Sequence, residues 1–416
     1  MIRCTEALDT VQPEQDLVEA MRWEIEGRVQ GVGFRPFVHR LATRLHLTGQ
    51  VWNSGGRVIV EAQGNPSQLA RFAHDLIQNA PANSDPHIAR SNAIAARAAT
   101  SFEIRSSQIA TQATGIPAPH IPSDMPICAL CLVEMNDSAD RRYRYPFTHC
   151  DQCGPRYSIM TGLPYDRVRT SLNDFPLCPD CSREYHDPIN RRFHAQSISC
   201  PQCGPQLRYR GGPAREIKDT AQALEAAIAV LAKGGIVAVR GVGGYHLMVD
   251  ATNDAAVALL RLRKHRPEKP LAVMFPWQGE DGLDALRKAA LVTDIDAQAL
   301  CSPEHPIVLL PLQTGHELGS AVAPGLNEIG ALLPYAPLHH LILSALNRPL
   351  IATSANISGD PIITDPKDAE QRLAAVADGF LHHDRQILHR IDDGIYRQIA
   401  NRVRPIRLGR GATPWE

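Results

Sequence analysis

The sequence lacks the features of a membrane or secreted protein. It contains no run of about 18 apolar residues, the length that a bilayer-spanning helix needs. The N-terminal stretch MIRCTEALDTVQPEQDL carries acidic side chains early and has no apolar signal core. The chain also has no large excess of charge of one sign, since its net charge is −1 at pH 7. A near-neutral charge disfavours a nucleic-acid partner. We therefore expect a cytoplasmic protein without a membrane span.

Length and composition describe a soluble globular chain with several domains. The chain has 416 residues, of which 44% are apolar. This length is too great for one hydrophobic core and predicts two to four domains.

Cysteine is the informative residue type. Eight of the 10 cysteines form four Cys-x-x-Cys pairs, and the array repeats after fifty positions, with CDQCGPRY at 150–157 and CPQCGPQLRY at 200–209. Two such pairs can hold one tetrahedral ion. We therefore expect two copies of a four-cysteine module, each with a structural Zn²⁺. The expected ligands are Cys128, Cys131, Cys150, Cys153, Cys178, Cys181, Cys200 and Cys203.

Two other interpretations of the cysteines are weaker. Disulfides would need an oxidising compartment and usually a short secreted chain. A catalytic zinc would need an open coordination position, which four thiolates do not leave. Each ion could bind adjacent pairs, or the modules could exchange pairs, and the spacing leaves this open.

Composition and periodicity divide the chain into domains. The fold class is multidomain: an α+β domain, a double zinc module and an α/β domain with a mostly mixed or parallel sheet. The boundaries are 1–20 for a tail, 21–106 for the α+β domain, 107–127 for a linker, 128–205 for the zinc modules, 206–218 for a second linker and 219–416 for the α/β domain.

Hydrophobic periodicity predicts the elements of the two larger domains. In the first we expect strands at 23–29, 48–53, 57–64 and 101–105 and helices at 34–47 and 66–80. In the last we expect a helix capped by Asp219, further helices at 254–265, 338–346 and 368–380, and strands at 236–239, 271–275, 306–312 and 349–354.

A glycine-spaced loop, Gly27 to Arg35, lies between an expected strand and helix. Its backbone N–H groups can form an anion nest, and Arg35 adds a guanidinium for phosphate oxygens. Alone, the loop could equally be a tight turn with a surface arginine. The motif and the order of elements resemble the acylphosphatase family over about 21–106 and imply a ferredoxin-like fold. By that resemblance Arg35 binds an acyl phosphate and Asn53 positions the attacking water.

Two further motifs lie in the α/β region. Lys264 and Arg266 stand at a helix-to-strand junction, and Ser354 and Asn356 follow an expected strand, where open α/β sheets bind ligands. Each alone could be a solvated helix end or a capped turn. Together they resemble YrdC-type nucleotide-binding domains, in which these positions bind ATP.

The three regions in this order resemble the family of HypF carbamoyltransferases, which mature [NiFe]-hydrogenases. The resemblance covers about 21–416 and implies that carbamoyl phosphate is cleaved at Arg35 and Asn53. It implies that carbamate then joins AMP from ATP, with Mg²⁺, at Lys264, Arg266, Ser354 and Asn356. In that family the carbamoyl group passes to the C-terminal cysteine of the partner HypE.

The family continues with a further ATPase-like domain, and this chain stops where that domain would begin. A fragment, a truncated product and half of a split enzyme remain open, so the last transfer is left undecided. Two other functions also remain open. One is threonylcarbamoyl-adenylate synthesis for tRNA modification, and the other is a non-enzymatic, zinc-stabilised interaction module.

Overall fold

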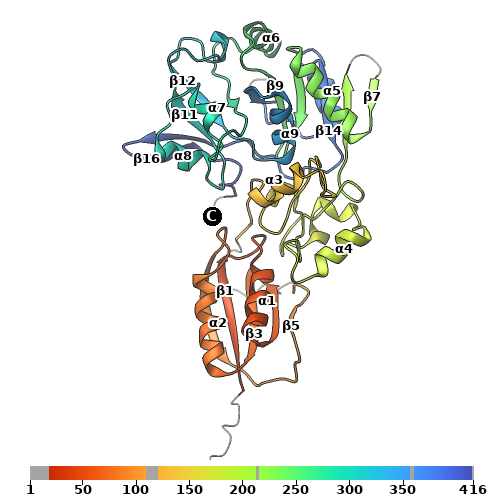
Figure 1. Ribbon diagram of the computed structural model, residues 1–416, viewed down its shortest axis with the longest axis vertical. Helices are drawn as coiled ribbons and strands as arrows, with labels where there is room; N and C mark the ends of the chain where they lie inside the picture. The colour runs from red at the N-terminus through yellow and green to blue at the C-terminus, as the bar shows by residue number, and fades with distance from the viewer. Residues whose placement is uncertain (1–17, 109–119, 212–214, 357–359, 415–416) are drawn as a thin grey trace, which may run out of the picture. The chain divides into compact units, whose positions relative to one another are not determined.

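The computed structural model describes residues 18–108, 120–211, 215–356 and 360–414 (Figure 1). The chain forms two compact units. The first comprises Met1–Val29 and Phe34–Pro119, and the second comprises Gln30–Gly33 and His120–Glu416. Much of the predicted tail at 1–20 and of the predicted linker at 107–127 lies outside the described residues.

The first unit contains a five-stranded sheet with the order β4-β1-β3-β2-β5. Neighbouring strands pair antiparallel, except β2 and β5, which pair parallel. The element order up to β4 is β-α-β-β-α-β, the ferredoxin-like arrangement. The strands are β1 (Glu19–Arg28), β2 (Thr48–Ser54), β3 (Arg57–Gly64), β4 (Asp85–Ala93) and β5 (Phe102–Ile104).

Helices α1 (Phe34–Arg44) and α2 (Pro66–Gln78) contact each other and the sheet. The apolar stripe of each helix supplies the core, and the rings of Trp23 and Phe72 meet edge-to-face at 5.5 Å. Helix α2 begins as its sequence predicts, because Pro66 occupies the first turn and Asn65 caps it.

Strand β4 is absent from the sequence prediction. It pairs with β1 at the sheet edge, and nearly all of its side chains are exposed or half-buried. The segment therefore shows no apolar alternation that would identify a strand. Its conformation comes from the hydrogen bonds that β1 offers.

The second unit begins with two short zinc-module helices that share the fifty-residue repeat. Helix α3 (Ala129–Asn136) starts after Cys128, and helix α4 (Pro179–His186) starts after Cys178. Three 3₁₀ turns lie between them, η1 (Tyr157–Ile159), η2 (Arg167–Arg169) and η3 (Ser171–Asp174).

The rest of the second unit is built on an 11-stranded mixed sheet with the order β16-β15-β11-β12-β10-β13-β9-β8-β14-β6-β7. The predicted mixed sheet is thus confirmed. Its strands are β6 (Leu207–Gly211), β7 (Arg215–Ile217), β8 (Val237–Arg240), β9 (Tyr245–Asp250), β10 (Val273–Met274), β11 (Ile307–Pro311), β12 (Glu328–Leu332), β13 (Leu350–Ser354), β14 (Gly379–His383), β15 (Ile395–Ile399) and β16 (Arg402–Arg407).

Helices pack against this sheet through two hydrophobic clusters of buried residues. The predicted cap of α5 is confirmed, because Asp219 accepts a hydrogen bond from Gln222 N at 2.9 Å. The helices are α5 (Thr220–Ala232), α6 (Asp254–Lys264), α7 (Asp284–Arg287), α8 (Asp294–Leu300), α9 (Pro337–Leu346) and α10 (Pro366–Arg372), with the 3₁₀ turn η4 (Ser320–Val322).

Two sequence expectations differ from the structure here. The segment 206–218, expected as a linker, contains β6 and β7, and β6 pairs with β14. The helix expected at 368–380 ends at Arg372, and Gly379 already belongs to β14. In both cases pairing with a distant strand decides the conformation, which local periodicity does not report.

The zinc region and the sheet share one core. Met135, Tyr145 and Phe147 of the first module belong to the same cluster as Leu224 and Leu343 of helices α5 and α9. A backbone hydrogen bond from Ile127 N to Tyr335 O at 3.0 Å adds to this contact. The zinc modules are therefore integral to the second unit. Among the described residues, no helix has the length and apolarity to cross a membrane.

Candidate functional sites

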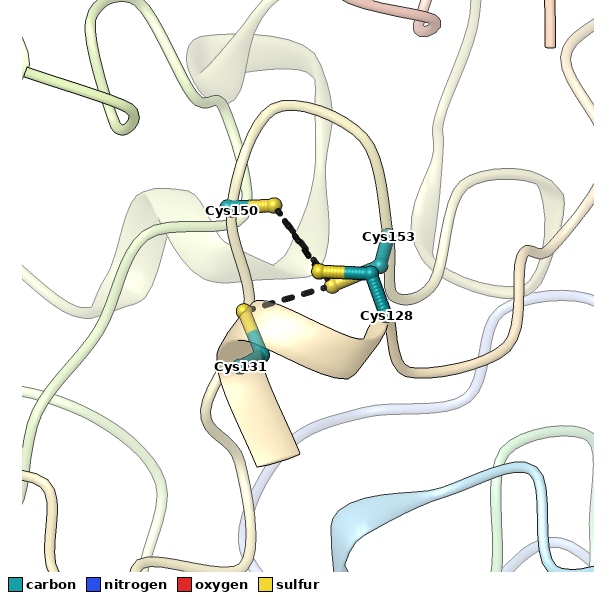
Figure 2. Close-up of side chains that lie close together, drawn as sticks. All are labelled: Cys128, Cys131, Cys150 and Cys153. Atoms are coloured by element: carbon teal, nitrogen blue, oxygen red, sulfur yellow. Dashed lines mark hydrogen bonds between the residues drawn. The ribbon is translucent and has the colours of Figure 1, made fainter. Parts of the chain in front are cut away.

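The first four cysteines converge on one point (Figure 2). Their Sγ atoms all lie within 4.8 Å of one another. Cys128 and Cys150 are 3.7 Å apart, and Cys131 and Cys153 are 3.6 Å apart. Tetrahedral zinc with Zn–S bonds of about 2.3 Å requires sulfur–sulfur edges of about 3.8 Å, so the donor set fits the ion.

The second group, Cys178, Cys181, Cys200 and Cys203, has the same arrangement. Its Sγ atoms at Cys178 and Cys200 are 3.7 Å apart, as are those at Cys200 and Cys203. Adjacent pairs in the sequence thus form each site, and exchange of pairs between modules is excluded. These are two structural zinc sites, each closed by four sulfurs.

Local sequence explains how each module brings its sulfurs together. The first cysteine of each module stands at a helix N-terminus, and the second lies one turn later on the same face. The second pair lies on a turn, where Gly154 has φ +98° and a Cβ would lie 2.5 Å from the His149 ring. Glycine is therefore required at this position.

Arg35 lies in the first turn of α1, in the first unit. Its Nη1 donates to Ser107 Oγ at 3.1 Å. The next residue, Gln108, donates its backbone N–H to Asn53 O at 2.8 Å. The segment Ser107–Gln108 thus contacts both predicted catalytic residues.

Asn53 in β2 is only 1% exposed, and neither its amide nitrogen nor its amide oxygen has a hydrogen-bond partner among the described residues. An unsatisfied buried amide costs about 1–3 kcal/mol. Unsatisfied buried groups of this kind usually occur where a ligand or a bound water completes the hydrogen bonds. The Asn53 amide can therefore bond to a ligand or a water, as its predicted role requires.

The four residues of the second predicted site lie together. Lys264, at the end of α6, donates from Nζ to Ser354 O and lies 3.4 Å from Asn356 Oδ1. Ser354 Oγ donates to Asn356 Oδ1 at 3.0 Å. Arg266 reaches the same strand end, where its Nη1 lies 3.5 Å from Thr353 Oγ1. Helix α6 and strand β13 therefore present two cations and three short polar side chains to one place.

These residues line a cavity of about 500 Å³ in the second unit. The volume suits a nucleotide-sized ligand. Burial, and secondly the charge of Arg266, lower the pKa of Lys264 to about 7. An anion that entered the cavity would favour the charged form of the amine, because it would supply the missing opposite charge.

The cavity is also lined by His246, Asp393 and Arg407, of which the sequence placed only His246 near the pocket and gave it a packing role as an equal alternative. His246 pairs with Ser354 across β9 and β13, and its Nε2 lies 3.1 Å from Asp393 Oδ2. Burial opposes ionisation of Asp393, but the His246 hydrogen bond and the Arg410 charge hold its pKa below the usual value. No local signal joins residues this far apart, and only the tertiary structure brings them together.

Comparison with protein families divides the chain in the same order. Residues 21–104 match the acylphosphatase family. Residues 127–160 and 177–209 each match the HypF finger. Residues 229–409 match the Sua5, yciO and yrdC family, described as telomere recombination.

Whole-chain relatives have the same name throughout. The chain is 43% identical over 398 residues to the carbamoyltransferase HypF of Synechocystis sp., covering 96% of this chain and 51% of that protein. It is 44% identical over 426 residues to the carbamoyltransferase HypF2 of Cupriavidus necator, covering 97% and 51%. A crystal structure of full-length HypF in a phosphate- and nucleotide-bound form matches with a TM-score of 0.90 and 38% identity, covering 97% and 51%.

Proposed function

Since the chain belongs to the HypF carbamoyltransferase family, we propose that it makes carbamoyl-adenylate. The chain spans about half the length of the curated relatives that it matches. The first unit hydrolyses carbamoyl phosphate, and the second unit joins the resulting carbamate to AMP from ATP, releasing pyrophosphate. The observation that carries this proposal is the convergence of Lys264, Arg266, Ser354 and Asn356 on one cavity.

The first unit supplies the residues for the hydrolysis. The Arg35 guanidinium binds the phosphoryl oxygens, and the Asn53 amide orients the attacking water. Both roles suit the geometry, because Ser107–Gln108 contacts both residues and the Asn53 amide has unused hydrogen-bonding capacity. Gly31 and Gly33 have φ of +67° and +73°, a backbone conformation that glycine adopts readily.

In the second unit the Lys264 and Arg266 charges stabilise the ATP phosphates, and Mg²⁺ would add its charge to the same oxygens. Ser354 and Asn356 supply short hydrogen-bonding groups that hold the nucleotide in position. The carbamoyl group then passes to a HypE-type protein as the acceptor. The zinc thiolates require a reducing environment, and we place the chain in the cytoplasm on this ground.

Release of phosphate and pyrophosphate from carbamoyl phosphate, ATP and Mg²⁺ tests the two steps together. Both products are expected from the parent chain. In Lys264→Met the rate of pyrophosphate release is expected to fall about 10²-fold while phosphate release continues, because the two reactions use different side chains. Pyrophosphate formed from threonine and bicarbonate without carbamoyl phosphate would contradict the proposal and favour the tRNA-modification function.

Nucleotide binding is expected to take up a proton at Lys264. With a pKa of about 7, the free amine is mostly charged at pH 6 and mostly neutral at pH 8. Bound phosphates require the charged amine, so proton uptake on binding rises from about 0.1 proton per nucleotide at pH 6 to about 0.9 at pH 8. The affinity for the nucleotide therefore falls as the pH rises. Calorimetry in two buffers of different ionisation enthalpy measures the uptake.

Lys264→Met removes the amine and is expected to bring uptake at pH 8 close to zero. Lys233→Met is the matched control, because Lys233 is an exposed residue at the end of α5. Equal uptake at pH 6 and pH 8 in the parent chain would show that Lys264 does not bind the phosphates.

A further inference from the structure

The two zinc modules contact each other through a reciprocal set of arginines. Arg141 and Arg142 of the first module reach the second, and Arg191 and Arg192 of the second reach the first. Each arginine, and each group that it contacts, has a counterpart fifty positions away. The interface therefore has an approximate two-fold symmetry within one chain.

The contacts end on the zinc ligands themselves. Arg141 Nη2 lies 3.1 Å from Cys181 Sγ, and Arg142 Nη2 lies 3.5 Å from it. In the opposite direction, Arg191 Nη2 lies 2.8 Å from Cys131 Sγ. Each site thus receives guanidinium groups from the module that does not supply its sulfurs.

A shared carboxylate and a backbone carbonyl hold each arginine pair in place. Arg142 donates to Glu184 Oε1 at 3.2 Å and to Ser199 O at 2.9 Å. Its counterpart Arg192 donates to Glu134 Oε1 at 3.2 Å and to His149 O at 3.1 Å. Arg142 and Arg192 are only 1% and 3% exposed. Two guanidinium groups this deeply buried need fixed negative charge nearby.

The charges of the sites supply the reason for this arrangement. A Zn²⁺ ion with four thiolates has a net charge of −2, which is costly to bury without compensation. The pair Arg141 and Arg142, with Glu184, adds a net charge of +1 beside the second site. Hydrogen bonds to metal ligands also affect affinity, because loss of such a contact typically costs about 10- to 100-fold in metal binding.

We propose that each zinc site is held by the arginines of the other module, so that the two sites bind metal interdependently. Metal binding at one site holds its four sulfurs where they meet the arginines of the other module. That module is then fixed in the position in which its own sulfurs meet. By linkage, the effect is the same in both directions.

The test is a comparison of Arg141→Gln and Arg191→Gln in the full zinc-loaded chain. Each variant is challenged with increasing chelator, and freed thiols are alkylated and located by peptide mass spectrometry. In Arg141→Gln, Cys178, Cys181, Cys200 and Cys203 are expected to become reactive first, at about 10- to 100-fold lower chelator than in the parent. In Arg191→Gln, the other four cysteines are expected to react first.

Two further variants separate this effect from general destabilisation. Arg183→Gln removes an exposed arginine of α4 that pairs with Asp180, and it is expected to leave both sites as in the parent. Arg141→Lys keeps the charge but loses the planar fork, so it is expected to restore part of the metal retention. The proposal is overturned if Arg141→Gln frees the sulfurs of its own module first or matches Arg183→Gln.

Discussion

Arg35→Ala is expected to lower kcat/KM for carbamoyl-phosphate cleavage by about 10³-fold. The guanidinium supplies paired donors to the phosphoryl oxygens, and loss of one such donor typically costs about 10²–10³ in rate. Phosphate release from carbamoyl phosphate is the measurement. Nucleotide binding should stay at the parent level, because it depends on a separate set of side chains in the second unit.

The matched control is Arg44→Ala, which removes an exposed arginine from the last turn of the same helix. It should leave cleavage unchanged. Cleavage by Arg35→Ala at the rate of Arg44→Ala would rule out the proposed phosphate-binding role.

Asn53→Leu provides a complementary control on the same site. The substitution puts an apolar side chain of similar size in place of a buried amide whose hydrogen bonds are unmet. The free energy of unfolding should therefore be unchanged or rise by about 1 kcal/mol. Cleavage should nevertheless be lost, because no group would orient the water. A variant that retains cleavage would show that Asn53 has only a structural role.

Cys131→Ser is expected to destabilise the second unit strongly. A structural zinc contributes about 10–16 kcal/mol in small zinc-finger peptides, which is comparable with the whole stability of a typical domain. The effect should extend to the sheet, because Met135, Tyr145 and Phe147 belong to a core cluster shared with α5 and α9. Zinc content should fall from two ions per chain, and thermal unfolding should begin at a much lower temperature.

Cys301→Ser is the matched control, because Cys301 is exposed and lies outside both four-sulfur groups. It should keep both zinc ions and the parent melting curve. If Cys131→Ser melted like Cys301→Ser, the first zinc site would contribute nothing to the fold.

Short-range spacing let the sequence predict much of the site. The Cys-x-x-Cys spacing identifies the sulfurs because two cysteines three positions apart lie on one turn whatever surrounds them. The loop from Gly27 to Arg35 and the cap at Asp219 are local in the same sense. In each case neighbouring residues in the chain supply the interaction.

Contacts between distant residues were beyond single-sequence reasoning. Strand β4 has too few apolar residues to be recognised, and it forms because β1 offers an edge. Strands β6 and β7 lie in a segment expected as a linker, because their strand conformation depends on pairing of β6 with the distant β14 and of β7 with β6. Asp393 and His246 are in contact only because the tertiary fold brings them together.

The sequence by itself determined the identity of the eight sulfurs and the fold class of each region, and its residues for the two anion sites stay a prediction. Tertiary structure decided which cysteine pairs share an ion, which arginines face which sulfurs, and how Lys264 loses its usual basicity. The physical reason is that turn and helix geometry depend on a few adjacent residues. Burial and charge pairing depend instead on groups that only the folded chain brings within a few ångströms.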